Sequence, residues 1–250
     1  MISMDLYKDL LNYPDECLDN RKIHKTLIYE NGDLKTRDKK IIEQNIELIT
    51  WKYAFTKEDL NIPFYVDEIR EYLEVEIVEI QLRKKQKIKR IADILFRTMP
   101  HPSLLFFRYK NEVNIYAAHV KKHGSDYSIF TYEEEMIKTG WINFNQINKK
   151  TEKLMNDLKL ENLNNMNFYT LYNDVYNALI NYRSYILKNE KTGTFIDEKK
   201  KILKEIDEIE NNIKELKTQI KKDINFNEVV ELNIQINEYE KEKVELINRL

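Results

Sequence analysis

Two polar side chains in a predicted β-strand could bind a divalent metal ion. In the run VEIVEIQL, residues 75–82, Glu79 and Gln81 are two positions apart and therefore lie on one face of the strand. Some metal-dependent nucleases carry an acidic residue and a Lys or Gln at this spacing, and Asp67 or Glu68 could supply a further carboxylate. Such a site usually follows two earlier strands, whereas the sequence indicates only one. A strand face that is solvated or salt-bridged is the alternative interpretation, and it is favoured.

The segment that follows this strand is strongly basic. The run QLRKKQKIKR, residues 81–90, contains the cationic side chains Arg83, Lys84, Lys85, Lys87, Lys89 and Arg90. Such a cluster could neutralise several phosphates of a DNA or RNA backbone, each adding a salt-dependent contribution to affinity. A solvated charged surface is the alternative, because most charge runs bind no ligand.

No other motif for catalysis or cofactor binding is evident. His119 and His123 are four residues apart, but they lie at the end of a predicted strand, where the i, i+4 spacing of helical metal ligands does not apply. Cys17 has no CxxC companion, and neither a Ser/His/Asp signature nor a glycine-flanked nucleophile occurs. The 4 glycines are isolated, which excludes a phosphate-binding glycine loop. We therefore expect no cofactor and no bound metal, and an enzyme is less strongly indicated than a binding protein.

Composition indicates a soluble protein without a strong overall charge. Charged residues make up 34% of the 250 residues and hydrophobic residues 42%, values that fit neither a disordered nor a membrane-spanning chain. The net charge of −2 gives no general attraction to phosphate backbones, so any nucleic-acid binding must be local. The N-terminal residues contain no apolar signal core, and the single cysteine fits a reducing compartment. A cytoplasmic location without membrane association is the expectation.

The first 145 residues alternate between helical and strand periodicity. Apolar side chains at Ile42, Ile46, Ile49 and Tyr53 share a helical spacing, which predicts one amphipathic helix over residues 36–53. The later elements are predicted at 75–82 (strand), 88–100 (a helix that stops at Pro100), 103–110 and 112–122 (a β-hairpin) and 126–134 (strand). A small mixed sheet with helices on one face is the expected arrangement.

The C-terminal region has the heptad pattern of helices that pack against each other. Apolar residues recur every three or four positions in two runs, at Ile202, Ile206, Ile209, Ile213, Leu216 and Ile220 and then at Val229, Leu232, Ile236, Tyr239, Leu246 and Leu250. The runs are out of register, so a continuous helix would place Asp223 and Asn227 in the apolar seam. Asn225 with Glu228 resembles a capping box at the start of a second helix. An antiparallel hairpin is therefore predicted in preference to one rod.

A hairpin of two helices buries one seam and leaves other apolar residues uncovered. Leu203, Val230, Ile234, Val244 and Ile247 flank the seam and need a further partner, which could be the same chain, a second copy or another protein. We expect a protein partner to bind the hairpin through its central apolar residues, namely Ile209, Ile213, Leu216, Ile220, Val229, Leu232, Ile236 and Tyr239.

Several stretches together carry a resemblance to a known family. They are IELITWKYAFTKEDLNI, VEIVEIQLRKK, MPHPSLLFFRYKNEVNIYAAHVK and INFNEVVELNIQINEYEKEKVEL. In this order they resemble an uncharacterised bacterial domain family encoded beside helicases and DNA methyltransferases in restriction and antiphage defence loci. The resemblance implies an accessory role near DNA-processing machinery and transfers no catalytic residue. Where the family often has two acidic residues in the central strand, this chain has Glu79 and Gln81.

These observations predict an α+β protein in three regions. A body with a small mixed sheet and packed helices occupies residues 1–145, a helical region 146–192, and an antiparallel coiled-coil hairpin 193–250. The favoured function is a non-enzymatic accessory subunit of a bacterial DNA-processing or antiphage defence complex, with a helicase or methyltransferase of the same locus as the candidate partner. The alternatives are a magnesium-dependent nuclease using Asp67, Glu79 and Gln81, and nucleic-acid binding through residues 83–90. Homodimerisation is also open.

Overall fold

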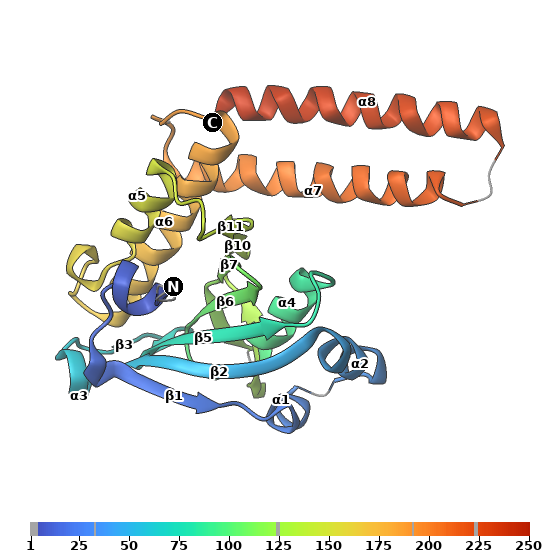
Figure 1. Ribbon diagram of the computed structural model, residues 1–250. Helices are drawn as coiled ribbons and strands as arrows, with labels where there is room; N and C mark the ends of the chain where they lie inside the picture. Colours follow the sequence, from blue (N-terminus) through green and yellow to red (C-terminus); the bar gives the residue numbers. More distant parts are fainter. Residues whose placement is uncertain (1–4, 33, 124–125, 192, 223–224) are drawn as a thin grey trace. The chain divides into compact units, whose positions relative to one another are not determined.

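Figure 1 shows the computed structural model, which describes residues 5–32, 34–123, 126–191, 193–222 and 225–250. Side chains are described at all of these positions except 122–123 and 126–129. The chain divides into two compact units, Met1–Leu179 and Ile180–Leu250, and helix α6 (Phe168–Lys188) begins in the first and ends in the second. The expected three-part division at 145/146 and 192/193 stays a prediction.

A mixed sheet forms the centre of the first unit. In the described residues its order is β1-β2-β5-β6-β7-β10, and β11 also pairs with β7. Strands β5 and β6 are parallel and joined through α4 (Ile88–Thr98), while the other neighbours are antiparallel. The strands are β1 (Leu18–Lys22), β2 (Ile46–Phe55), β5 (Val75–Leu82), β6 (Ser103–Tyr109), β7 (Glu112–Ala117), β10 (Ile137–Lys138) and β11 (Ile142–Asn143).

Two short hairpins and several small helices complete this unit. Strand β3 (Tyr65–Val66) pairs with β4 (Glu71–Tyr72), and β8 (Val120–His123) pairs with β9 (Asp126–Tyr132). The predicted run 112–122 is thus divided between β7 and β8. The remaining short elements are η1 (Leu6–Leu10), η2 (Asp15–Cys17), α3 (Lys57–Leu60), α5 (Lys149–Asp157) and η3 (Leu160–Asn162).

Helices cover both faces of the sheet. Helices α1 (Lys25–Asn31), α2 (Thr36–Asn45) and α4 contribute to an apolar core on the face that carries Val78, Ile80 and Leu82. On the opposite face, Tyr7 of η1 lies against the rings of Tyr53 and Phe106, with ring centroids 5.6 Å and 5.3 Å away. The expectation of helices on one face was therefore incomplete. The alternation of Glu79 and Gln81 with buried apolar residues along β5 is confirmed.

The predicted helix over residues 36–53 is wrong beyond Asn45. Helix α2 ends there, and Ile46 begins the ten-residue strand β2, which pairs with β1 on one side and β5 on the other. The run IELITWKYAF is rich in β-branched and aromatic residues, which pack well in a central strand. Irregular pairing within β2 lets Ile46, Ile49 and Tyr53 all be buried at spacings that also suit a helix. Among the described residues, two strands of the central sheet, β1 and β2, therefore precede β5.

The second unit contains two antiparallel helices, α7 (Ile196–Ile220) and α8 (Phe226–Arg249) (Figure 1). The Asn225 side chain accepts a hydrogen bond from the Glu228 backbone N–H at 2.9 Å, so the predicted N-cap is present. Asn227 is exposed in α8, whereas Asp223 lies outside the described residues. The α+β class with C-terminal helices in contact is confirmed, while coiled-coil geometry stays a prediction.

Ion pairs tie the elements of the second unit together. Lys243, at the seam position that lacks an apolar residue, donates to Glu210 across the hairpin at 2.8 Å. Arg183, near the end of α6, forms a two-pronged ion pair with Asp207 of α7. Among the described residues, no helix is long and apolar enough to cross a membrane.

An ion pair between α2 and α4 gives a pH-dependent prediction. Arg90 donates to both carboxylate oxygens of buried Asp38, at 2.9 Å and 2.7 Å, and these hydrogen bonds lower the pKa of Asp38. Because the folded-state pKa is depressed, the stabilisation is complete above the ordinary value of about 4 and is lost as the pH falls further. Asp38→Asn should lower the free energy of unfolding by about 1 kcal/mol at pH 7 and by less at pH 3, measured by urea denaturation.

The matched control is Asp157→Asn, which removes an exposed pair with Lys153 on α5. It should change stability by less than about 0.5 kcal/mol at either pH. An Asp38→Asn effect that is equal at pH 7 and pH 3 would contradict the role given to the ionised pair.

Candidate functional site

Glu79, the first predicted catalytic residue, is held in an ion pair on β5. Its carboxylate accepts a hydrogen bond from the Tyr7 hydroxyl at 2.9 Å and another from Arg108 of β6 at 2.9 Å. Burial, and then the Glu79 charge, raise the pKa of Tyr7, so this hydroxyl stays protonated and donates. Gln81 is half-buried and faces Arg108 in the parallel register. The arrangement matches the salt-bridged strand face that was the alternative to a metal site.

Asp67, the second predicted carboxylate, organises the turn between β3 and β4. It accepts hydrogen bonds from the backbone N–H groups of Ile69 and Arg70 and from the Tyr65 hydroxyl. The backbone hydrogen bond from Ile69 is the largest cause of its lowered pKa. Asp67 and Glu79 have different hydrogen-bond partners among the described residues, and neither belongs to a group of three or more clustered acidic, cysteine and histidine side chains there.

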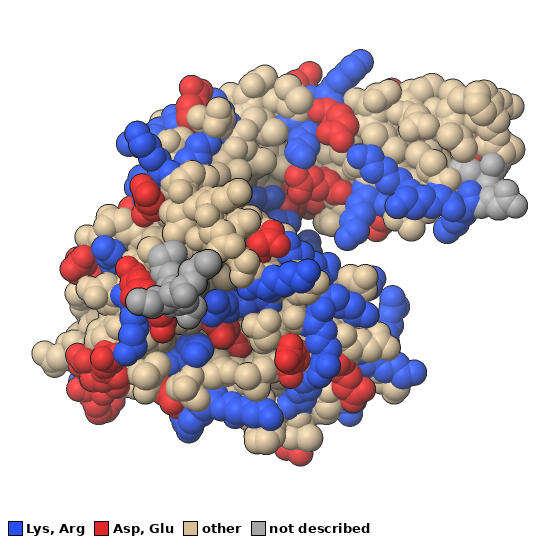
Figure 2. Space-filling model, in the orientation of Figure 1, with Lys and Arg blue, Asp and Glu red and all other residues tan. Residues whose placement is uncertain are grey.

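The basic segment 83–90 divides into paired and unpaired side chains. Arg90 binds Asp38 and Asp93, and Lys85 pairs with Glu112 and lies over the Trp141 ring. Arg83 donates through Nε to the backbone oxygen of Ile46 at 3.2 Å. In the described residues no carboxylate pairs with Lys84, Lys87, Lys89 or Arg83. Figure 2 shows Lys and Arg side chains over the face of the sheet and helices in view, with acidic side chains between them.

A cluster that was not predicted lies where β5 and β6 begin. Glu74 immediately precedes β5, Glu76 is its second residue, and His101 lies two residues before β6. Because β5 and β6 are parallel, with Glu76 opposite Ser103, these starting points share one edge of the sheet. One ligand atom from each of Glu74, Glu76 and His101 lies within 4.8 Å of the others. Glu74 Oε1 and His101 Nε2 are 3.5 Å apart.

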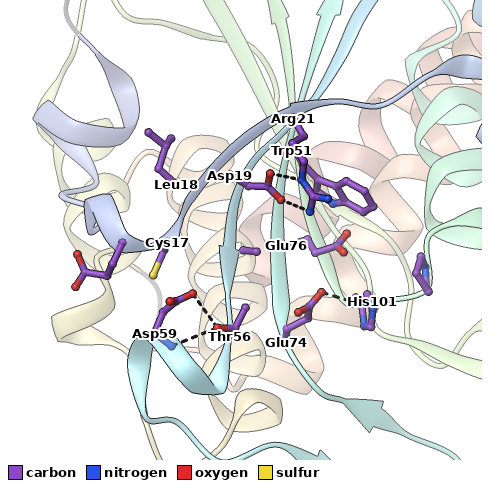
Figure 3. Close-up of a pocket in the computed structure, with 13 residues that line it drawn as sticks. Cys17, Leu18, Asp19, Arg21, Trp51, Thr56, Asp59, Glu74, Glu76 and His101 are labelled. Carbon is purple, nitrogen blue, oxygen red and sulfur yellow. Dashed lines mark hydrogen bonds and ion pairs between the residues drawn. The ribbon is translucent and has the colours of Figure 1, made fainter.

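The cluster opens into a cavity of about 570 Å³. Figure 3 shows Glu74, Glu76 and His101 converging on one side of it, with Cys17, Asp59 and Thr56 on the other. Arg21 of β1 is held by Asp19 and lies over the Trp51 ring, its guanidinium carbon 5.5 Å from the ring centroid. The cavity therefore combines two carboxylates and an imidazole with a cation near its rim.

Burial controls the charges in this cavity. Glu76 is only 2% exposed, and this desolvation is the main reason that its pKa is raised to about 8, with the Glu74 charge adding to the effect. Burial likewise raises the pKa of Cys17 to about 12, so the thiol is protonated and is not an activated nucleophile. At neutral pH the Glu76 carboxyl is therefore mostly protonated unless a cation lies beside it.

The sequence contained a signal for this cluster that spacing alone did not single out. Glu74 and Glu76 are two residues apart on one strand, as are Glu79 and Gln81. His101 stands alone in the sequence, and only the parallel pairing of β5 with β6 brings it to the glutamates. His119 is buried elsewhere, with Nδ1 2.6 Å from the Tyr72 hydroxyl, and the side chain of His123 lies outside the description.

The predicted partner-binding residues lie mainly in the seam between α7 and α8. Ile209, Ile213 and Ile236 are buried, and the other five residues, Leu216, Ile220, Val229, Leu232 and Tyr239, are half-buried. Of the flanking residues, Val230, Ile234 and Val244 are exposed, Ile247 is half-buried and Leu203 is buried. Phe226, at the start of α8, is also exposed, with 79% of its surface accessible.

Comparison with known proteins assigns the chain to a family without a described function. No curated protein and no solved structure matches the chain significantly. One family model matches residues 11–242 and so spans most of both units. The chain belongs to the family described as "Domain of unknown function (DUF4391)".

Proposed function

We propose that this chain is an accessory protein that binds a protein partner through its C-terminal hairpin. The observation that carries the proposal is an exposed apolar stripe on α8, formed by Phe226, Val230, Ile234 and Val244. Ile234 is 53% exposed and Phe226 is 79% exposed, although both side chains are large and apolar. Phe226, Val230 and Ile234 follow one another at spacings of four, whereas exposed Asn237 and Lys241 separate them from Val244 on the same face. An exposed row of large apolar side chains is typical of interaction sites.

The stripe is separate from the seam that joins the two helices. At 3.6 residues per turn, the four stripe residues fall within about 80° of the helix circumference. The seam residues Leu232, Ile236 and Leu250 lie on roughly the opposite side. Helix α8 therefore has two apolar faces, of which contact with α7 uses one. Figure 2 shows that the side of α8 in view is largely uncharged.

Charges beside the stripe indicate the chemistry of the partner. Four exposed glutamates follow one flank of the stripe, at Glu231, Glu238, Glu242 and Glu245. No cation pairs with them in the described part of the chain. A helix from another protein, with an apolar stripe bordered by Lys or Arg, would cover the apolar residues and pair with these carboxylates. We therefore propose an amphipathic, basic helix as the bound element.

The setting of this interaction is also a proposal. The resemblance of the sequence to proteins encoded in restriction and antiphage defence loci supports an accessory subunit of a DNA-processing or defence complex. A helicase or DNA methyltransferase encoded nearby is the candidate carrier of the basic helix. A second copy of the chain would have to place two acidic flanks near each other, which disfavours self-association through this surface.

Ile234→Asp should release the partner while leaving the hairpin folded. The substitution places a charge in the centre of the stripe but outside the seam, so we expect helicity by circular dichroism to be unchanged. Recovery of the co-purifying protein from the native host should fall at least tenfold, measured by quantitative mass spectrometry of affinity-purified tagged chain, because an unpaired charge would be buried.

Gln235→Asp is the matched control, because it adds the same charge at the next, exposed position away from the stripe. It should retain the partner. Equal recovery with Ile234→Asp and Gln235→Asp would rule out the stripe as the binding surface, and a dimer dispersed by Ile234→Asp would identify a second copy as its occupant.

A second candidate function is contact with a nucleic-acid backbone through the basic segment. The favouring observation is that Arg83, Lys84, Lys87 and Lys89 have no carboxylate partner in the described residues, whereas Lys85 and Arg90 do. Unpaired cations close together in sequence can each neutralise a phosphate and release a counterion. This role is compatible with a hairpin that recruits a DNA-processing partner.

Replacing Lys87 and Lys89 by Gln should weaken binding to double-stranded DNA and reduce its salt dependence. For each phosphate contact removed, the slope of log affinity against log salt concentration should become shallower by roughly 1, measured by fluorescence anisotropy over a range of KCl concentrations. Replacing Lys153 by Gln on α5 is the control. A slope close to zero for the unmodified chain would exclude backbone contact.

A further inference from the structure

The buried carboxylate of Glu76 has only weak hydrogen-bond donors, Ser103 and Trp51. The nearest is the Ser103 hydroxyl, whose Oγ lies 3.4 Å from Glu76 Oε2. The same hydroxyl lies 2.8 Å from the backbone oxygen of His101, and its single hydrogen belongs to that shorter bond. The Trp51 indole N–H also interacts with this carboxylate and lowers its pKa, although no hydrogen bond of good geometry joins the two in the described residues. A carboxylate that is 2% exposed is thus only weakly hydrogen-bonded and points into the cluster with Glu74 and His101.

A second polar group beside the cluster is also unsatisfied. The Trp51 indole Nε1 is buried and has no acceptor in the described part of the structure. Buried polar groups are normally satisfied by protein, ordered water or a ligand. The Trp51 N–H is directed toward the Glu76 carboxylate, and both groups border one polar cavity in which a bound polar group would complete their hydrogen bonding.

The spacing of the three clustered side chains suits a metal ion. Ligand oxygens and nitrogens lie about 2.0–2.2 Å from a bound zinc ion, so two of them in a tetrahedral site are roughly 3.4 Å apart. Glu74 Oε1 and His101 Nε2 are 3.5 Å apart, and the Glu76 ligand atom is within 4.8 Å of both. A small contraction around an ion would bring all three into coordination distance.

The alternative occupant is a proton shared between the two glutamates. A proton would relieve the repulsion between Glu74 and Glu76, but it would leave both the His101 imidazole and the cavity without a role. Arg21 lies at the rim of the cavity and offsets part of the negative charge of the glutamates. Its guanidinium, however, is already bound by Asp19. A divalent cation accounts for all three side chains at once.

We propose that Glu74, Glu76 and His101 form a binding site for one divalent transition-metal ion, with Zn²⁺ or Mn²⁺ as the ion. Imidazole favours transition metals over Mg²⁺ and Ca²⁺, and paired carboxylates suit Zn²⁺ and Mn²⁺. The three protein ligands leave coordination positions directed to the cavity, where water or an anionic group would bind. The site is independent of the α8 stripe and of the basic segment, and it is distinct from the nuclease site expected at Asp67, Glu79 and Gln81.

Isothermal titration calorimetry of the full chain, after removal of metals with a chelator, tests the site directly. Titration with ZnCl₂ and with MnCl₂ should show saturable binding of one ion per chain for at least one of the two. Glu74→Gln, Glu76→Gln and His101→Gln should each weaken that binding roughly tenfold or more, because each removes one ligand. Absence of saturable binding of either ion would overturn the proposal.

Two controls separate loss of a ligand from loss of folding or from general acidity. Glu16 lines the same cavity but lies outside the cluster, so Glu16→Gln should leave the affinity unchanged. Circular dichroism should show a folded chain for Glu74→Gln and His101→Gln, whose side chains are half-buried, even if Glu76→Gln is unstable. Equal weakening by Glu16→Gln, or unchanged affinity in folded Glu74→Gln and His101→Gln, would contradict the assigned ligands.

A spectroscopic measurement identifies the imidazole ligand independently of affinity. Pulsed electron paramagnetic resonance of the Mn²⁺-loaded chain should show coupling to a nitrogen nucleus, and this coupling should disappear in His101→Gln. Loss of the nitrogen coupling in His101→Gln would support His101 as a ligand. The same coupling in His101→Gln and in the unmodified chain would place the ion elsewhere.

Discussion

The parallel pairing of β5 with β6 is the constraint on which the candidate site depends. Helix α4 crosses over between the two strands, so both strands start at the same edge of the sheet. This arrangement places His101, at the start of β6, beside Glu74 and Glu76 at the start of β5. The same register sets Arg108 opposite Gln81 and within reach of Glu79. One pairing therefore creates both an ion pair and an uncompensated pair of carboxylates.

The two glutamates of β5 show how environment decides the role of a carboxylate. Glu79 accepts hydrogen bonds from an arginine and a tyrosine, and its charge is balanced inside the sheet. Glu76 lies on the other face, is almost fully buried and has no donor at short distance. Because an ionised carboxylate in an apolar environment is strongly unfavourable, Glu76 requires a proton or a cation. The site that could bind a ligand is the one that the protein leaves unbalanced.

The hairpin has a comparable division between satisfied and unsatisfied surfaces. The seam between α7 and α8 is complete, since Lys243 replaces an apolar residue but pairs with Glu210. The opposite side of α8 exposes Phe226, Val230 and Ile234 beside a row of glutamates. Folding of the hairpin uses only the first face. The second has the composition of an interface, and it supports the proposal that the hairpin recruits a partner.

Local signals in the sequence were sufficient for much of the fold. The helix predicted at 88–100, which ends at Thr98, the strand at 75–82 and the hairpin with its Asn225 cap depend on periodicity and capping within one segment, and all three are present. The segment 36–53 was misinterpreted because Ile42, Ile46, Ile49 and Tyr53 satisfy a helical period and also an irregular central strand. Hydrogen bonds from β1 and β5 settle that ambiguity, and they come from residues distant in the sequence.

The sequence by itself determined which residue types are present and which short segments are helices or strands, because these properties depend on neighbouring residues. Only the tertiary structure decided which carboxylates at and near β5 are held by a cation and which form an open cluster. Glu74-x-Glu76 and Glu79-x-Gln81 have the same spacing, but their partners, His101 and Arg108, are brought to them by strand pairing. The physical reason is that the charge balance of a buried carboxylate depends on groups near it in space.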